Sequence, residues 1–445
     1  MARRTKTQTL ALWANGTHVG RWTVNANGDM ELEYDPSWRT APQGRPLSLS
    51  LPFGFGDEPL KGPAVLHYFD NLLPDSPAML KRLAERFRTG SVETFELLQA
   101  IGRDCVGALQ LMPENMTPVG HDRIEGVPVD DAAIERHLLQ VVSPDRQGAA
   151  SDPDDDFRIS LAGAQEKDAF LRWNDVWMKP RGATPTTHIF KMPLGLVGGR
   201  QADFTTSVDN EWLCLKLLGA YGLPVPSAEI AQFGRQRVLV VERFDRITAP
   251  NGQHLLRLVQ EDFCQATGTS PLLKYESEGG PGLQILFNLL QQSVEAERDL
   301  RTLMAAQVLF WMLRAPDGHA KNFSIQILPR GRYRLTPLYD VMSAYPVMGD
   351  GPNQWSPREV KMAMALVGKH RHYDAQRIQR RHFNSTTMQY GYGASAEPLI
   401  QELIDRTPGV IDAVGSQLPS GFSSKVADKV LGGLMAAAKA LADMS

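Results

Sequence analysis

The sequence predicts an α+β fold in which a mixed half of strands and helices precedes a mainly helical half. Short alternating segments separated by Asn-Gly turns occupy residues 7–34 and predict a β-rich N-terminal subdomain. Helical periodicity dominates from about residue 255 onward. The acidic, proline-containing stretch SDPDDDF at 151–157 has no periodicity and is typical of a surface linker. We therefore expect three parts, 1–150, 151–250 and 251–445, with a ligand cleft between the last two.

The N-terminal subdomain is expected to begin with a three-stranded β-meander. Asn15-Gly16 and Asn27-Gly28 supply residues that tolerate a positive φ in the tight turns between its strands. Helical patterns follow at 77–88 and 92–101, and the segment VGALQLMP at 106–113 alternates like another strand. A short helix near 130–142 ends this part.

The remaining elements follow from the same periodicities. Between 158 and 244 we expect strands at 168–172, 187–192 and 237–243, with an apolar-rich helix across 209–221. The second half should contain helices at 281–292, 299–314, 396–405 and 421–442, interrupted by paired strands at 323–328 and 332–336. The helix 299–314 is apolar on most of its circumference, which predicts that it is buried and rigid.

Composition limits the classes of function. The 445 residues are 42% hydrophobic and 22% charged, with a net charge of −3, as in an ordinary soluble protein and unlike one built wholly for nucleic acid. Three isolated cysteines form neither a disulfide framework nor a zinc pattern, which indicates a reducing compartment. No apolar run is long enough to cross a bilayer, and the N-terminus lacks a secretory signal. We expect a cytoplasmic protein that does not contact a membrane.

A candidate catalytic loop lies at 315–328, APDGHAKNFSIQIL, directly after the buried helix. Asp317 and Asn322 have the Asp-x-x-x-x-Asn spacing of a kinase catalytic loop, in which the aspartate orients the attacking hydroxyl and the asparagine binds magnesium. Asp340 follows the expected hairpin and ends a strand, where kinases place a second magnesium ligand. Each residue alone also fits an ordinary turn or helix cap. Their order along the chain favours phosphoryl transfer.

Further groups suited to nucleotide binding lie upstream. Lys191 in THIFKMP can pair with phosphates, and Glu211 in the following helix can orient it. Solvent-exposed positions for both side chains are the plainer alternative. The chain has no G-x-G-x-x-G loop and no Walker A sequence. The candidate phosphate loop is SLAGAQEK at 160–167, whose small residues Ala162, Gly163 and Ala164 let backbone N–H groups approach phosphate oxygens, although a simple turn fits equally.

The chain resembles the HipA family of bacterial serine/threonine kinase toxins along nearly its whole length. The resemblance rests on ten segments: RPLSLSLP (45–52), FDNLLPDSP (69–77), IGRDCVGALQL (101–111), DFRISLAGAQEK (156–167), TPTTHIFKMP (184–193), VDNEWLCL (208–215), VERFDR (241–246), KYESEGGPG (274–282), DGHAKNFS (317–324) and RLTPLYDVMSAYP (334–346). It implies a protein-kinase-like two-lobed fold with an extra N-terminal subdomain. It also implies ATP and Mg²⁺ as cofactors and a small helix-turn-helix, HipB-like antitoxin as partner.

The resemblance assigns roles to individual residues. It implies that Asp317 is catalytic, that Asn322 and Asp340 bind magnesium, and that Ser160 is autophosphorylated. The residues expected to bind ATP are Lys191, Glu242 and Phe244 of the hinge, His319, Lys321 and the loop residues Ala162, Gly163 and Ala164. Pro316 stands where a threonine is familiar, and Leu161 follows Ser160 where a β-branched residue is expected. Neither departure alters the assignment.

The basic run KHRHYDAQRIQRRHF at 369–383 is a candidate DNA contact through Arg377, Arg380 and Arg381, with a solvated helix face as the alternative. The sequence thus predicts an ATP-dependent protein serine/threonine kinase. By resemblance it would phosphorylate glutamyl-tRNA synthetase and so arrest translation and growth, and an operator-bound antitoxin would neutralise it. Two alternatives stay open: a catalytically silent co-repressor of the antitoxin, and a small-molecule kinase of related fold.

Overall fold

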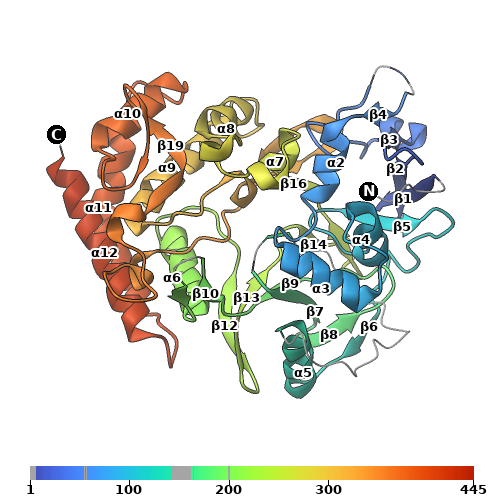
Figure 1. Cartoon of the computed structure of the whole chain (residues 1–445), viewed down its shortest axis with the longest axis horizontal. Helices are drawn as coiled ribbons and strands as arrows, with labels where there is room; N and C mark the ends of the chain where they lie inside the picture. Colours follow the sequence, from blue (N-terminus) through green and yellow to red (C-terminus); the bar gives the residue numbers. More distant parts are fainter. Residues whose placement is uncertain are drawn as a thin grey trace.

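The structure, a computed structural model, describes residues 7–54, 56, 58–142, 162–163, 165–198 and 201–444. The chain forms two lobes and an N-terminal subdomain (Figure 1), and residues of all three line one cavity. In Figure 1 the helices α9 to α12 form the left side, and the N-terminal sheet lies at the upper right. The predicted α+β architecture, with a mainly helical second half, is confirmed. No described helix combines the length and the apolar character needed to cross a membrane.

The N-terminal subdomain is a five-stranded antiparallel sheet of order β4-β3-β2-β1-β5, covered by helices. Its strands are β1 (Gln8–Ala14), β2 (Thr17–Val24), β3 (Met30–Tyr34), β4 (Leu60–Lys61) and β5 (Leu109–Pro113), and its helices are α1 (Pro36–Thr40), α2 (Pro63–Asp70), α3 (Pro77–Phe87) and α4 (Thr94–Ile101). The Asn15-Gly16 turn adopts the expected positive φ at both residues. Trp22 stacks on Phe69 with ring centroids 3.7 Å apart, which joins the sheet to α2.

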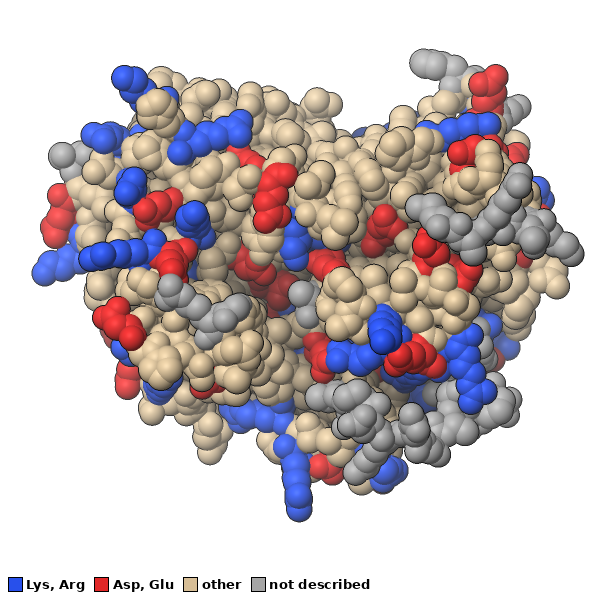
Figure 2. All heavy atoms as spheres, in the orientation of Figure 1, with Lys and Arg blue, Asp and Glu red and all other residues tan. Residues whose placement is uncertain are grey.

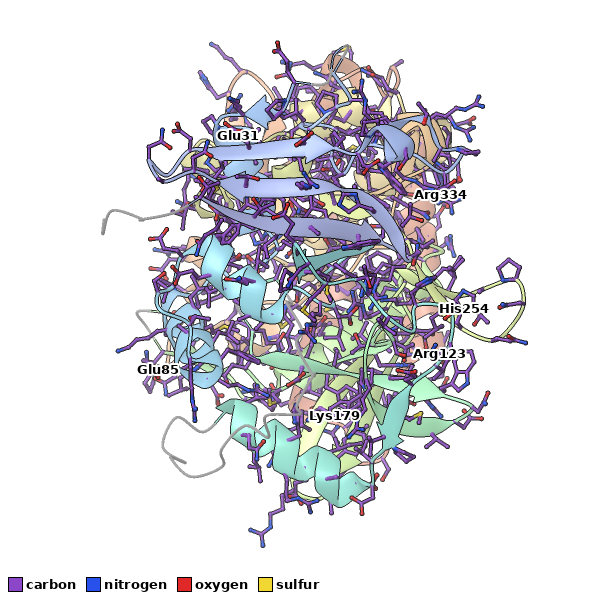
Figure 3. All side chains as sticks on the ribbon, turned by 90° about the vertical axis from the view of Figure 1, so that its right-hand side faces the viewer. Glu31, Glu85, Arg123, Lys179, His254 and Arg334 are labelled. Atoms are coloured by element: carbon purple, nitrogen blue, oxygen red, sulfur yellow. The ribbon has the colours of Figure 1, made fainter. Side chains whose placement is uncertain are left out.

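The first lobe is a six-stranded sheet of order β12-β13-β9-β7-β8-β6. Its strands are β6 (Gly126–Pro128), β7 (Lys167–Trp173), β8 (Val176–Pro180), β9 (His188–Lys191), β12 (Ala228–Phe233) and β13 (Gln236–Glu242). Helix α6 (Ser207–Ala220) packs against β12 and β13, and α5 (Asp131–Val142) packs Ile134 and Leu138 against Phe170 and Phe190. Figure 3 shows the N-terminal sheet, with Glu31 in β3, stacked above this second sheet, with Lys179 in β8.

Residues 126–142 pair and pack with this second sheet, although the predicted boundary near 151 placed them in the N-terminal subdomain. Two small hairpins complete the lobe: β10 (Gly195–Val197) with β11 (Ala202–Phe204), and β14 (Arg246–Thr248) with β15 (Leu255–Arg257).

The second lobe is built around α9 (Ala296–Leu313), whose side chains are buried from Leu300 onward except at Arg301. The other helices are α7 (Phe263–Ala266), α8 (Leu283–Leu290), α10 (Arg380–Gln389), α11 (Glu397–Gly415) and α12 (Ser424–Asp443). Strands β17 (Ser324–Ile327) and β18 (Tyr333–Leu335) follow Asn322 along the chain, and β16 (Gln260–Asp262) pairs with β17 to complete a three-stranded sheet. The hairpin of β19 (Lys361–Val367) and β20 (Arg371–Asp374) was not predicted.

Candidate active site

A cavity of about 880 Å³ lies between the lobes and receives residues from all three parts of the chain. Figure 2 shows a hollow near the middle of this face, with acidic side chains at its floor. The lobes line the cavity with residues of strands β9 and β13, helix α6 and the segments 316–324 and 339–344. The N-terminal subdomain contributes Asn71, Asp75 and Val106. A cavity of this size suits a ligand as large as a nucleotide.

Strand β9 directs Lys191 into the cavity. Side chains alternate along a strand, so Phe190 packs in the core whereas Ile189 and Lys191 line the cavity. The Lys191 Nζ atom lies 2.6 Å from Oε1 of Glu211, on α6, and 2.9 Å from Oδ1 of Asp340. Only 8% of the Lys191 side chain and 2% of the Glu211 side chain are exposed. The predicted lysine, its glutamate and the predicted metal-binding aspartate therefore meet at one point.

The charges of this triad are strongly coupled. Burial alone would raise the pKa of Asp340, but the ammonium groups of Lys191 and Lys167 outweigh it and hold that pKa well below its usual range. Burial alone would lower the pKa of Lys191, and the carboxylates of Asp340 and Glu211 raise it instead. Asp340 has a φ of 58°, a left-handed conformation that aspartate tolerates better than most residues. This backbone conformation directs its carboxylate toward Lys191.

The candidate catalytic segment, residues 316–324, follows helix α9, whose C-cap residue Arg314 has a φ of 51°. The Asn322 side-chain nitrogen donates to the backbone carbonyl of Asp317 at 2.6 Å, which ties the two ends of the loop together. That bond uses the amide nitrogen and leaves the Asn322 side-chain oxygen as its acceptor group. The Asp317 side chain is 44% exposed and its Oδ1 accepts a hydrogen bond from the Tyr275 hydroxyl at 2.5 Å.

The candidate phosphate loop, residues 160–167, is described only in part. Ala162 and Gly163 line the cavity, whereas Ser160 and Ala164 lie outside the described residues. Gly163 has a φ of 106°, and a Cβ atom there would lie 2.7 Å from the Lys167 Nζ atom. Glycine therefore allows the loop to cover Lys167 closely. Burial lowers the pKa of Lys167 to about 8. This second cavity lysine, which pairs with Lys191 across β7 and β9, was not singled out from the sequence.

The segment 242–244 leaves β13 at the apolar end of the cavity. Glu242 and Phe244 both line the cavity, together with Ile189, Leu215 and Val241. The Phe244 ring lies 5.7 Å from the ring of Tyr339, centroid to centroid. This apolar slot with adjacent backbone groups suits a planar base, as the prediction for these two residues requires.

His319 and Lys321 line the cavity, but their contacts differ from those of free phosphate ligands. The Lys321 Nζ atom donates to the side-chain oxygen of Asn71 at 2.7 Å and to Asp262 at 2.9 Å. Lys321 thus joins the N-terminal subdomain to β16. His319 is buried, which lowers its pKa, and its ring meets that of Tyr275 edge-on at 4.9 Å.

The basic run follows the other candidate site residues in the sequence. None of its three candidate arginines, Arg377, Arg380 and Arg381, lines the cavity. Most of the run forms β20 and the turns on either side of it, so the alternative of one solvated helix face is wrong for it. Arg377 is 82% exposed and pairs with Asp374, and Arg381 is exposed. Arg380 is turned inward, where it contacts Glu397 and the carbonyl of Leu441.

The residues expected to hold magnesium fit that ion. Within the described ranges, no group of three or more His, Cys, Asp or Glu side chains is arranged to hold a metal. Magnesium in phosphoryl transfer usually has only one or two protein ligands, with phosphates and waters supplying the rest. Asn322 and Asp340 both line the cavity and offer an amide oxygen and a carboxylate, the hard oxygen donors that magnesium prefers.

Comparison with known proteins adds to this geometry. Residues 159–411 match the HipA-like C-terminal domain, and residues 10–112 match the HipA N-terminal domain. The chain is 35% identical to the putative kinase Y4mE of Sinorhizobium fredii over 76% of this chain and 78% of that one. It is 27% identical to the serine/threonine-protein kinase toxin HipA of Shewanella oneidensis, over 81% and 79% of the two chains.

The fold also has a counterpart among solved structures. A chain of the Shewanella oneidensis MR-1 complex of HipA, HipB and operator DNA superposes with a TM-score of 0.77 at 23% identity. The match covers 97% of this chain and 96% of that chain, so the N-terminal subdomain and both lobes share the arrangement.

Proposed function

This chain belongs to the HipA family of serine/threonine-protein kinase toxins, and from that premise we propose that it transfers the γ-phosphoryl group of ATP to a protein hydroxyl. The supporting observation is the convergence of Lys191, Glu211, Asp317, Asn322 and Asp340 on one cavity. Each has a task in phosphoryl transfer, and a silent co-repressor would need none of them.

In the proposed mechanism the chain acts by positioning and by charge. The Lys191 ammonium, held by Glu211, binds phosphate oxygens and offsets their negative charge. Asp317 accepts a hydrogen bond from the acceptor serine or threonine hydroxyl and orients its oxygen toward the γ-phosphorus. Asn322 and Asp340 would hold magnesium, which when bound neutralises charge on the transferred group. The apolar slot at Glu242 and Phe244 holds the adenine, and the loop at Ala162 and Gly163 covers the phosphates.

The partners follow from the family resemblance. We propose glutamyl-tRNA synthetase as the acceptor, so that its modification arrests translation, and a HipB-like antitoxin that neutralises this chain while bound to operator DNA. We also propose that Ser160 is autophosphorylated. Two added charges in a loop that covers ATP would repel the nucleotide, so the modification would switch the kinase off.

The decisive experiment measures phosphate transfer from radiolabelled ATP to purified glutamyl-tRNA synthetase. Asp317→Asn should lower kcat by about 10²- to 10⁴-fold while the Kd for ATP stays unchanged, because the lost carboxylate orients the acceptor and makes no core contact. Asp412→Asn, at an exposed position on α11, is the matched control and should behave as wild type. Full activity in Asp317→Asn would reject the mechanism. ATP binding without transfer to any protein would favour a small-molecule kinase, and absence of ATP binding would favour the co-repressor.

A further inference from the structure

A chain of side-chain contacts runs from the N-terminal subdomain to the candidate catalytic aspartate. The residue of this chain of contacts that touches Asp317 is Tyr275. Tyr275 belongs to the segment KYESEGGPG and lies 42 residues before Asp317 in the sequence. The Tyr275 hydroxyl lies 2.5 Å from Oδ1 of Asp317, and its ring meets His319 edge-on. Burial raises the pKa of Tyr275 well above its usual value, so its hydroxyl keeps its proton and donates to the carboxylate. One of the two carboxylate oxygens of Asp317 is therefore already hydrogen-bonded to Tyr275.

The residues on either side hold Tyr275 in place. Lys274 donates from its ammonium to Oδ2 of Asp75 at 2.8 Å, and its backbone carbonyl accepts from the amide of Ala320 in the catalytic segment at 3.3 Å. Glu276, on the other side, accepts from the backbone amide of Ala365 in β19 at 2.7 Å. A segment fixed on both sides presents a hydroxyl with little conformational freedom, which is what a precise orienting group requires.

Asp75 comes from the N-terminal subdomain, where it lies in the segment FDNLLPDSP, five residues beyond the end of α2 at Asp70. Its side chain is 11% exposed, and its second oxygen, Oδ1, has no hydrogen-bond partner among the described residues and lies 4.0 Å from the Lys321 ammonium. Asp75 and Lys274 both line the cavity. The N-terminal subdomain therefore reaches the catalytic segment through a nearly buried ion pair.

The half-exposed Asp317 carboxylate needs such an anchor. A carboxylate that is free to rotate presents either oxygen, in varying directions, to the acceptor. With Oδ1 bound to Tyr275, the Oδ2 atom is the one left to accept the proton of the acceptor hydroxyl. We infer that Tyr275 is a positioning residue that fixes Asp317 for phosphoryl transfer, and that Asp75 and Lys274 transmit this constraint from the N-terminal subdomain. The inference rests on the proposed function and extends it to residues outside the two lobes.

The first test compares Tyr275→Phe with Tyr333→Phe. Both substitutions remove one hydroxyl that donates to an oxygen, since Tyr333 donates to the carbonyl of Leu289 at 2.7 Å, away from the cavity. We expect Tyr275→Phe to lower kcat by about 10- to 100-fold with the Kd for ATP within about twofold of wild type, because misorientation affects only the transition state. Tyr333→Phe should keep wild-type kcat. Equal kcat in the two variants would overturn the inference while leaving the kinase proposal standing, and an inactive wild type would reject both.

The second test asks whether Asp75 acts through Tyr275. Asp75→Asn should lower kcat by about three- to tenfold, since the amide keeps the shape but not the charge that holds Lys274. In the double variant Asp75→Asn/Tyr275→Phe, kcat should equal that of Tyr275→Phe. Without the Tyr275 hydroxyl, a change at Asp75 has no remaining route by which to affect the orientation of Asp317. If the fold-losses in kcat of the two single variants multiply in the double variant, Asp75 acts independently of Tyr275, and the proposed relay is overturned.

Discussion

Substitutions at Lys191 can separate its contribution to the free energy of unfolding from its contribution to ATP binding and phosphoryl transfer. Lys191→Met removes the only cation that bonds directly to both Glu211 and Asp340 within the described residues, and leaves a 98% buried carboxylate beside another. Removing one partner of a buried ion pair costs about 3–5 kcal/mol. Lys167 remains close enough to act on both carboxylates, so we expect the lower end, about 3 kcal/mol. The Kd for ATP should rise at least about tenfold, since a phosphate ligand is lost.

The double variant Lys191→Met/Glu211→Gln completes this experiment. Neutralising Glu211 removes the buried unpaired charge, so most of the lost free energy of unfolding should return. Kinase activity should remain lost, because the Lys191 ammonium that we assign to the phosphates is still missing. Urea unfolding measures the first quantity, and radiolabelled transfer measures the second. A wild-type urea midpoint in Lys191→Met would refute the argument from burial, and renewed activity in the double variant would refute the role given to Lys191.

Three further predictions address other parts of the chain. Burial raises the pKa of Glu261 to about 8, so the folded chain retains a proton that the unfolded chain releases above about pH 4.5. Stability should therefore fall as pH rises from 5 to 7.5, by up to about 3 kcal/mol, and urea unfolding of Glu261→Gln should show this loss removed. Incubation with magnesium and ATP should yield a Ser160 phosphopeptide in mass spectrometry, together with lost ATP affinity; phosphate elsewhere with Ser160 unmodified would reject that switch. Reversing the charges of Arg377 and Arg381 should weaken operator binding by the antitoxin complex in a salt-dependent manner, and unchanged affinity would show these arginines to be merely solvated. Arg380 is left out of that variant because its contact with Glu397 is structural.

The regular elements with strong periodicity were predictable from sequence. The strands at residues 8–34 and the helices α9 and α12 appear close to their expected places, because each has a long apolar face or well-defined turns. Helix α11 begins where expected but runs to Gly415, ten residues beyond its predicted end. The hairpin β19–β20 was missed since its first strand is buried throughout except at Lys361 and shows no alternation. The placement of β6 in the sheet of the first lobe depends on pairing with β8, about 50 residues away, which no local pattern reports.

The candidate site was predictable where a known spacing exists. Asp317 and Asn322 share one loop, and Asp340 follows it in kinase order, so a general chemical pattern selected all three as candidates, and all three line the cavity. Lys167 and Tyr275 were missed because their significance depends on neighbours brought close by folding: Gly163 above Lys167, and Asp317 beside Tyr275. The segment KYESEGGPG contributed to the family resemblance, but nothing in it states what the tyrosine contacts.

Buried ion pairs also join the N-terminal subdomain to the segment that follows β13. Behind the hinge, Asp104 of the subdomain accepts hydrogen bonds from Arg246 at 3.0 Å and Arg257 at 3.1 Å, and Asp245 is paired with Arg243. These five side chains are at most 8% exposed. Charges so deeply buried are costly unless every partner is in place, so displacing Asp104 would leave these three buried arginines with Asp245 as the remaining carboxylate of the group. The segment 242–246, which we propose contacts the nucleotide, and Tyr275, which we propose orients Asp317, are both tied to the N-terminal subdomain, through Asp104 and Asp75. Ligands that move this subdomain would therefore act on nucleotide binding and on catalysis together.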